Sequence, residues 1–238
     1  VESLLKKIQQ ENLAENDFKQ ANSLHFVVRY EGSESNQALG QGILASLERS
    51  FTELENQLNY SPRDSIAVVL YPDEVFQDVT KMPGWVGALN DGKIRFPIKG
   101  LTFVDDTVRG ILKHELTHSF VRLKTAGNCP LWFNEGLAQY LEYENLSARA
   151  ARVQNARNRL RGKTLLPLSE LQKSLAELAD DAHGVRAGDD HVEVELARLH
   201  LFGEVFHADD VGAGFTRGVG ILAGSEHGDA DGLARAVR

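Results

Sequence analysis

The sequence predicts an α+β protein in which a mixed or antiparallel sheet packs on a long helix. Residues 24–32 and 64–72 are rich in Val, Ile, Leu and Tyr, as strands are. Residues 36–60 repeat apolar side chains at helical spacing. Residues 84–98 contain a turn signal between two apolar runs, which is typical of a β-hairpin. Strands and helices in this order favour an α+β fold.

The composition is that of an ordinary globular protein. Hydrophobic residues make up 42% of the chain and charged residues 25%. The net charge of −8 argues against a nucleic-acid-binding surface. Cys129 is the one cysteine, so no disulfide forms within the chain, and the compartment stays open. No apolar run is long enough for a membrane span, and because the chain begins with Val1, the missing signal peptide says little.

The N-terminal segment, residues 1–22, reads as one amphipathic helix. Leu4, Leu5, Ile8 and Leu13 fall at roughly helical spacing, which predicts a helix that packs through this side. The alternative is that the segment is the end of a helical-repeat region.

The next elements follow from apolar spacing and from turn residues. The strand at 24–32 ends at Gly32, and the strand at 64–72 ends at Pro72, after which residues 73–81 form a short helix. The helix at 36–60 carries its apolar residues on one side: Leu39, Ile43, Leu47, Phe51, Leu54 and Leu58.

Two helices follow the hairpin and are joined by a short loop. The first runs from about residue 105 to 126 and stops at Gly127, and the second covers about 131–145, after Pro130. The basic segment 149–163 predicts a further helix with a solvated face.

The last part of the chain, residues 174–238, differs in composition. It contains no Lys, Asn, Gln, Tyr, Trp or Pro, whereas the first 173 residues hold all of the lysines. Two interpretations stay open. The region is a Gly-rich and mobile C-terminal segment, or it is a frame-shifted reading of the gene.

The sequence HELTH, in the helix at 105–126, has the spacing of a metal site. His114 and His118 are four residues apart, so they project from one helix face and can share a Zn²⁺ ion. Glu115 lies at the edge of that face, where it can act as a general base on water. An ordinary helix with two exposed histidines gives the same pattern.

A third ligand is available on the following helix. Glu135 lies in the first turns of that helix, and the short loop between the two helices predicts that they are neighbours. Two histidines and one glutamate leave a fourth position open for water, as catalytic zinc sites do.

These two motifs, H-E-x-x-H and N-E-G-x-A, resemble the gluzincin metallopeptidases, and most closely their peptidase MA-like domains. The resemblance covers about residues 24–173. It implies one Zn²⁺ per chain held by His114, His118 and Glu135, with Glu115 as the base. It also implies a peptide or protein substrate, and a domain that follows helical repeats in a bacterial-type protein.

The chain departs from the family pattern at several positions. Asn90 stands where aminopeptidases of this clan carry a glutamate for the substrate amine, which favours an endopeptidase and leaves Asn90 as a turn residue. Asn134 or Gln139 would support the histidine rings. The donor that stabilises the transition state is not identified, because no tyrosine follows Tyr143. Tyr140 and Tyr143 are expected in core packing.

Two other functions compete with a metallopeptidase. One is an inactive protein of the same fold that binds extended peptides. The other is a structural site in which zinc clamps two helices, although structural sites fill all positions with protein groups. Cys129, as a fourth ligand, would give such a site.

Overall fold

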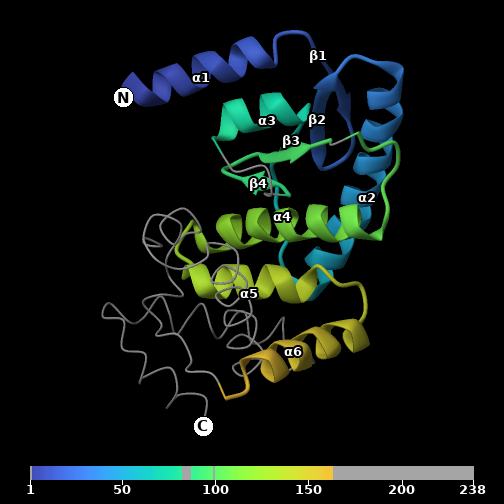
Figure 1. Cartoon of the computed structure of the whole chain (residues 1–238), viewed down its shortest axis with the longest axis vertical. Helices are drawn as coiled ribbons and strands as arrows, with labels where there is room; N and C mark the ends of the chain where they lie inside the picture. Colours follow the sequence, from blue (N-terminus) through green and yellow to red (C-terminus); the bar gives the residue numbers. More distant parts are fainter. Residues whose placement is uncertain (1, 82–86, 99, 163–238) are drawn as a thin grey trace. The chain divides into compact units, whose positions relative to one another are not determined.

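The computed structural model describes residues 2–81, 87–98 and 100–162 (Figure 1). The C-terminal region that the sequence sets apart, 174–238, lies outside them. The elements, in chain order, are α1 (Glu2–Ala14), β1 (Phe18–Asn22), β2 (Phe26–Glu31), α2 (Glu34–Leu58), β3 (Ile66–Tyr71), α3 (Asp73–Thr80), β4 (Leu89–Asn90), β5 (Ile94–Pro97), α4 (Asp106–Thr125), α5 (Leu131–Leu141) and α6 (Leu146–Leu160).

The described residues divide into two compact units. The first contains the whole sheet with α1, α3, most of α2 and α4 as far as Phe120. The second contains Asn56–Tyr60 and the described residues from Val121 onward, which include α5 and α6. Within the described ranges, no helix is both long and apolar enough to cross a membrane.

The sheet is mixed, as the sequence predicts. Its five strands lie in the order β1-β2-β3-β5-β4. The three inner strands are parallel, and β1 and β4 pair antiparallel at the two edges. The predicted hairpin is the β4–β5 pair, in which Leu89 faces Arg95 and Asn90 faces Ile94. The α+β class is therefore confirmed for this unit.

One face of the sheet packs against α2. The apolar positions predicted along this helix are all buried, namely Leu39, Ile43, Leu47, Phe51, Leu54 and Leu58. Phe51 lies 5.9 Å from the Phe26 ring of β2 and 4.9 Å from the Phe120 ring of α4, between ring centroids. A Cβ atom at Gly40 would come within 3.1 Å of the Tyr30 ring, so this glycine lets α2 approach the sheet closely.

The opposite face packs against α3 and the N-terminal segment, and α3 and α4 therefore lie on opposite sides of the sheet (Figure 1). A small apolar cluster forms where α3 meets this face, and it consists of Val69, Tyr71, Phe76 and Val79. The α3 helix ends at Lys81, which adopts a left-handed backbone conformation.

A buried polar cluster joins α1 to the same face of the sheet. Arg95 is 2% exposed and donates to Tyr71 Oη at 2.9 Å, to Glu11 Oε1 at 2.8 Å and to Asp91 Oδ1 at 2.9 Å. The Tyr71 hydroxyl in turn donates to the buried Glu15 carboxylate. Burial and this carboxylate raise the pKa of Tyr71, because both disfavour a phenolate.

The single helix predicted over residues 1–22 is wrong in its extent and in its buried side. The helix ends at Ala14, and residues 18–22 form β1 instead. Leu5, Ile8 and Leu13 are 54%, 44% and 80% exposed, so the predicted apolar side does not pack within the described part of the chain. The polar side of α1 is attached to the sheet through ion pairs, which apolar spacing does not reveal.

In the second unit, α6 begins at a side-chain cap. Asn145 Oδ1 accepts a hydrogen bond from the main-chain N–H of Ala148 at 2.7 Å. Arg149 is buried, donates to the carbonyl of Tyr143 at 2.8 Å and lies over the Tyr140 ring. The expected packing role of Tyr140 is confirmed, since Tyr140 is itself buried. The expected helix at 131–145 is shorter, because α5 ends at Leu141.

Candidate metal centre

Helix α4 presents the two predicted histidine ligands on one face. Its first turn is capped by Asp105, whose Oδ1 accepts from the main-chain N–H of Val108 at 2.8 Å. His114 and His118 follow at i and i+4, with their ring centroids 4.8 Å apart and their planes at 85°. Both side chains are half-buried.

The rotation of α4 is fixed by its buried side. Leu112, Leu116 and Phe120 are fully buried at spacings of four residues. Lys113, also buried, donates to Glu53 Oε2 of α2 at 2.5 Å. Because the histidines lie two positions after Leu112 and Leu116, they fall on a different side of the helix.

Glu135 contributes the third donor of the group. One ligand atom from each of His114, His118 and Glu135 lies within 4.8 Å of the others, and the Glu135 side chain is half-buried. Among the described residues, this is the one group of three or more His, Cys, Asp or Glu side chains close enough to hold a metal ion. Two imidazole nitrogens and one carboxylate oxygen are a donor set that suits a divalent transition metal.

Glu115 lies beside this group and outside it. Its side chain is buried, and it follows His114 directly along α4. One residue along a helix is a rotation of about 100°, so Glu115 projects from the flank of the histidine face. This is consistent with the expectation that Glu115 does not join the ligand set.

Asn90 has a role that the sequence does not reveal. It forms the predicted turn, since its Oδ1 accepts from the N–H of Gly92 at 3.2 Å. Its Nδ2 also donates to the main-chain carbonyl of Glu115 and to Ser119 Oγ, each at 2.7 Å. The edge strand β4 is thereby attached to the turn of α4 that contains His118. In the sequence, the only signal for this contact is a polar residue at the end of an edge strand.

The remaining predicted residues lie on α5 and before it. Asn134 Oδ1 is buried and has no hydrogen-bond partner among the described residues, and Gln139 is buried. Their support of the histidine rings stays a prediction. The Cys129 thiol donates a hydrogen bond to the carbonyl of Pro130, with 3.7 Å between sulfur and oxygen. Burial raises the pKa of Cys129 to about 12. Cys129 is not a member of the metal-binding group.

Comparison with known proteins finds no family model that matches the chain and no curated protein similar to it.

Proposed function

We propose that the protein is a zinc-dependent metallopeptidase of gluzincin type, with a catalytic domain related to the peptidase MA-like domains. The observation that carries this proposal is the proximity of ligand atoms from His114, His118 and Glu135. The first two residues belong to an H-E-x-x-H motif, and the third belongs to N-E-G-L-A on the next helix. The motif alone is common enough to be accidental, but the added carboxylate completes a known ligand set.

The proposed metal is one Zn²⁺ per chain. Three protein ligands are the number typical of catalytic zinc, whereas structural zinc takes four. When bound, zinc supplies Lewis acidity, which lowers the pKa of water and polarises a carbonyl group. Asn134 or Gln139 would orient a histidine ring by accepting its second N–H.

Glu115 is the proposed general base. Its carboxylate accepts a proton from the attacking water and passes it to the leaving amine. Burial on α4 and the Asn90 bond to the Glu115 carbonyl support this role, because both restrict movement of the residue.

The proposed substrate is a peptide or protein in an extended conformation. β4 is the last strand in the sheet order, and it is attached to α4 next to Glu115. An extended peptide can add to such an edge by main-chain hydrogen bonds. The side-chain amide of Asn90 donates its hydrogen bonds to α4. Because this amide is engaged there, the contact supports internal cleavage over recognition of a free N-terminal amine.

The test is hydrolysis of a fluorogenic peptide library by the zinc-loaded full chain. We expect wild type to cleave internal bonds, as identified by mass spectrometry of the products. Glu115→Gln should lower kcat by about 100-fold or more, because general-base catalysis contributes that much. Glu74→Gln, on the exposed side of α3, is the matched control and should retain activity. Equal activity in wild type and Glu115→Gln would remove Glu115 from the mechanism.

A second candidate is an inactive protein of the same fold that binds peptides. It is favoured by one observation: Tyr140 is buried against Arg149, and no tyrosine follows Tyr143 to stabilise a transition state. Saturable peptide binding by zinc-loaded wild type without any turnover would support this candidate over the peptidase.

A further inference from the structure

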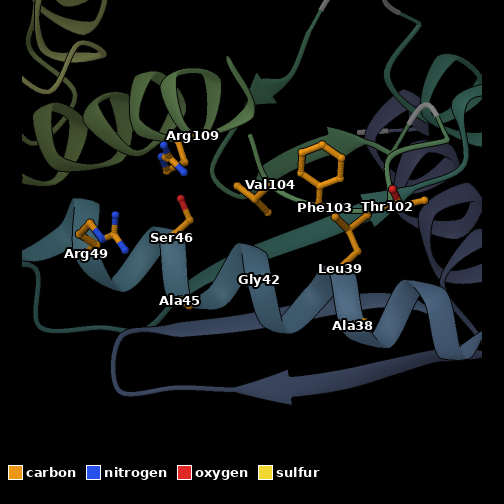
Figure 2. Close-up of a pocket in the computed structure, with 10 residues that line it drawn as sticks. All are labelled: Ala38, Leu39, Gly42, Ala45, Ser46, Arg49, Thr102, Phe103, Val104 and Arg109. Atoms are coloured by element: carbon orange, nitrogen blue, oxygen red, sulfur yellow. The ribbon is translucent and has the colours of Figure 1, made fainter. Parts of the chain in front are cut away.

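A groove of about 280 Å³ lies between α2 and the segment that leads into α4 (Figure 2). All of its lining residues belong to the first unit, and none of them is in the candidate metal centre. Ala38, Gly42 and Ala45 are small residues that line the groove from successive turns of α2. Val104 and Phe103 lie opposite, and Phe103 is 69% exposed. The groove is therefore mainly apolar along its length.

Ser46 introduces a buried polar group into the groove. This residue is 6% exposed, and its hydroxyl is buried without a hydrogen-bond partner among the described residues. Figure 2 shows the hydroxyl pointing away from α2, toward the space in front of Arg109. A buried hydroxyl is destabilising unless it forms a hydrogen bond, so an unpartnered one in a groove points to a ligand.

Two arginines line the same end of the groove. Arg49 follows Ser46 by three residues on α2, so the two side chains are neighbours on the helix surface. Arg109 comes from α4 and donates to Asp106, which is itself largely exposed. None of the lining residues in this described part of the chain is acidic. This end of the groove therefore attracts an anion, whereas the other end offers apolar contact.

We propose that the groove binds a small carboxylic acid with an apolar body. The carboxylate accepts hydrogen bonds from Ser46 Oγ and from the Arg49 guanidinium, whose planar donors match carboxylate geometry. Arg109 adds positive charge. The apolar body lies along Gly42 and Ala45. The volume equals roughly nine water molecules, at about 30 Å³ each, so the acid is short.

The test uses hexanoate as the probe and the ¹⁵N-labelled full chain as the protein. We expect hexanoate to shift the amide resonances of Ser46 and Arg49 until they saturate. Hexanamide, which has the same shape without the charge, should bind at least ten-fold more weakly. N-acetyl-leucine tests the same carboxylate chemistry at the end of a peptide-like molecule, and tighter binding than hexanoate would identify a peptide C-terminus as the source.

Variants locate the binding in the groove. Gly42→Leu should abolish binding by filling the apolar part of the groove, because a Cβ at Gly42 already comes to 3.4 Å from Val104 on the opposite wall. Arg49→Gln should weaken binding about ten-fold, and the exposed Arg63→Gln should not. Ser46→Ala should weaken it as well. The amide spectrum of each variant shows whether it is folded.

Three results would overturn the proposal. The first is hexanoate binding that does not saturate in wild type. The second is equal binding in wild type and a folded Gly42→Leu variant. The third is binding of hexanamide, or of inorganic phosphate, as tight as that of hexanoate, which would remove the requirement for a carboxylate with an apolar body.

Discussion

The side-chain amide of Asn90 donates a hydrogen bond of 2.7 Å to the main-chain carbonyl of Glu115. The same nitrogen donates to Ser119 Oγ at 2.7 Å. These bonds connect the edge strand β4 to the part of α4 that contains Glu115 and His118. Asn90 is separated from Glu115 by 25 residues in sequence, so the contact belongs to the tertiary structure.

Removing the Asn90 amide should loosen β4 from α4. We expect Asn90→Ala to lower the free energy of unfolding by about 1–2 kcal/mol, because two hydrogen bonds to α4 are lost at a partly buried site, together with the exposed one from the N–H of Gly92. Urea denaturation followed by circular dichroism measures this change. Asn16→Ala, which removes an exposed contact to Asp17, should change stability by no more than about 0.5 kcal/mol. Equal effects of the two substitutions would show that the Asn90 bonds do not hold β4.

Replacing Arg95 should be far more destabilising. Arg95→Met removes the buried cation that donates to Tyr71, Glu11 and Asp91, and we expect a loss of about 3 kcal/mol or more in the free energy of unfolding. The Arg29 side chain is 36% exposed and also pairs with Glu15. We expect Arg29→Met to lower the free energy of unfolding by less than Arg95→Met does. A loss below about 1 kcal/mol for Arg95→Met, measured by denaturant titration, would contradict a connected buried cluster.

The Glu11 carboxylate should make stability depend on acid pH. Burial opposes its charged form, but hydrogen bonds from Lys93 and Arg95 outweigh burial and lower its pKa below the ordinary 4.5. A lowered folded-state pKa gives stability that is complete above pH 4.5 and is lost as the pH falls through the lower folded-state value. In Glu11→Gln, the urea midpoint should therefore fall less between neutral pH and a pH below 4.5 than in wild type. An identical pH dependence in both proteins would exclude this role.

Substitution of two α2 glycines by alanine should have different effects on stability. A Cβ at Gly40 would press on the Tyr30 ring at 3.1 Å, whereas one at Gly42 has room. At both positions, the higher helix propensity of alanine should stabilise α2 by about 1 kcal/mol. We expect Gly42→Ala to keep this gain and Gly40→Ala to lose it, so that thermal unfolding separates the two proteins clearly. Similar melting temperatures would show that α2 does not need a glycine at the sheet.

Much of the fold follows from apolar periodicity. The six predicted positions of α2, from Leu39 to Leu58, are all buried because a helix against a sheet needs a continuous apolar side. The helix over 106–125 and the hairpin at Asn90 were predictable from their cap and turn residues. In the candidate centre, helix geometry predicts that His114 and His118 share a face, and the short loop between the two helices predicts that Glu135 lies near them.

The rest depends on contacts between distant segments. The strand β1 has the polar sequence FKQAN, and its pairing with β2 rests on main-chain hydrogen bonds that leave no apolar pattern. The cluster of Glu15, Tyr71 and Arg95 joins three segments far apart in sequence. The groove at Ser46 likewise requires α2 and residues 102–109 to meet. No local pattern reveals such pairings.

The zinc content of the purified full chain tests the central claim most directly. After loading with zinc and dialysis, elemental analysis should give about one zinc per chain in wild type and in Glu115→Gln, because one Glu–His–His ligand set remains intact in both. His118→Ala and Glu135→Ala should lose most of the metal, while Glu142→Ala, at the C-terminal end of α5, should keep it. A folded wild type without zinc, or zinc retained fully in Glu135→Ala, would contradict the proposed centre.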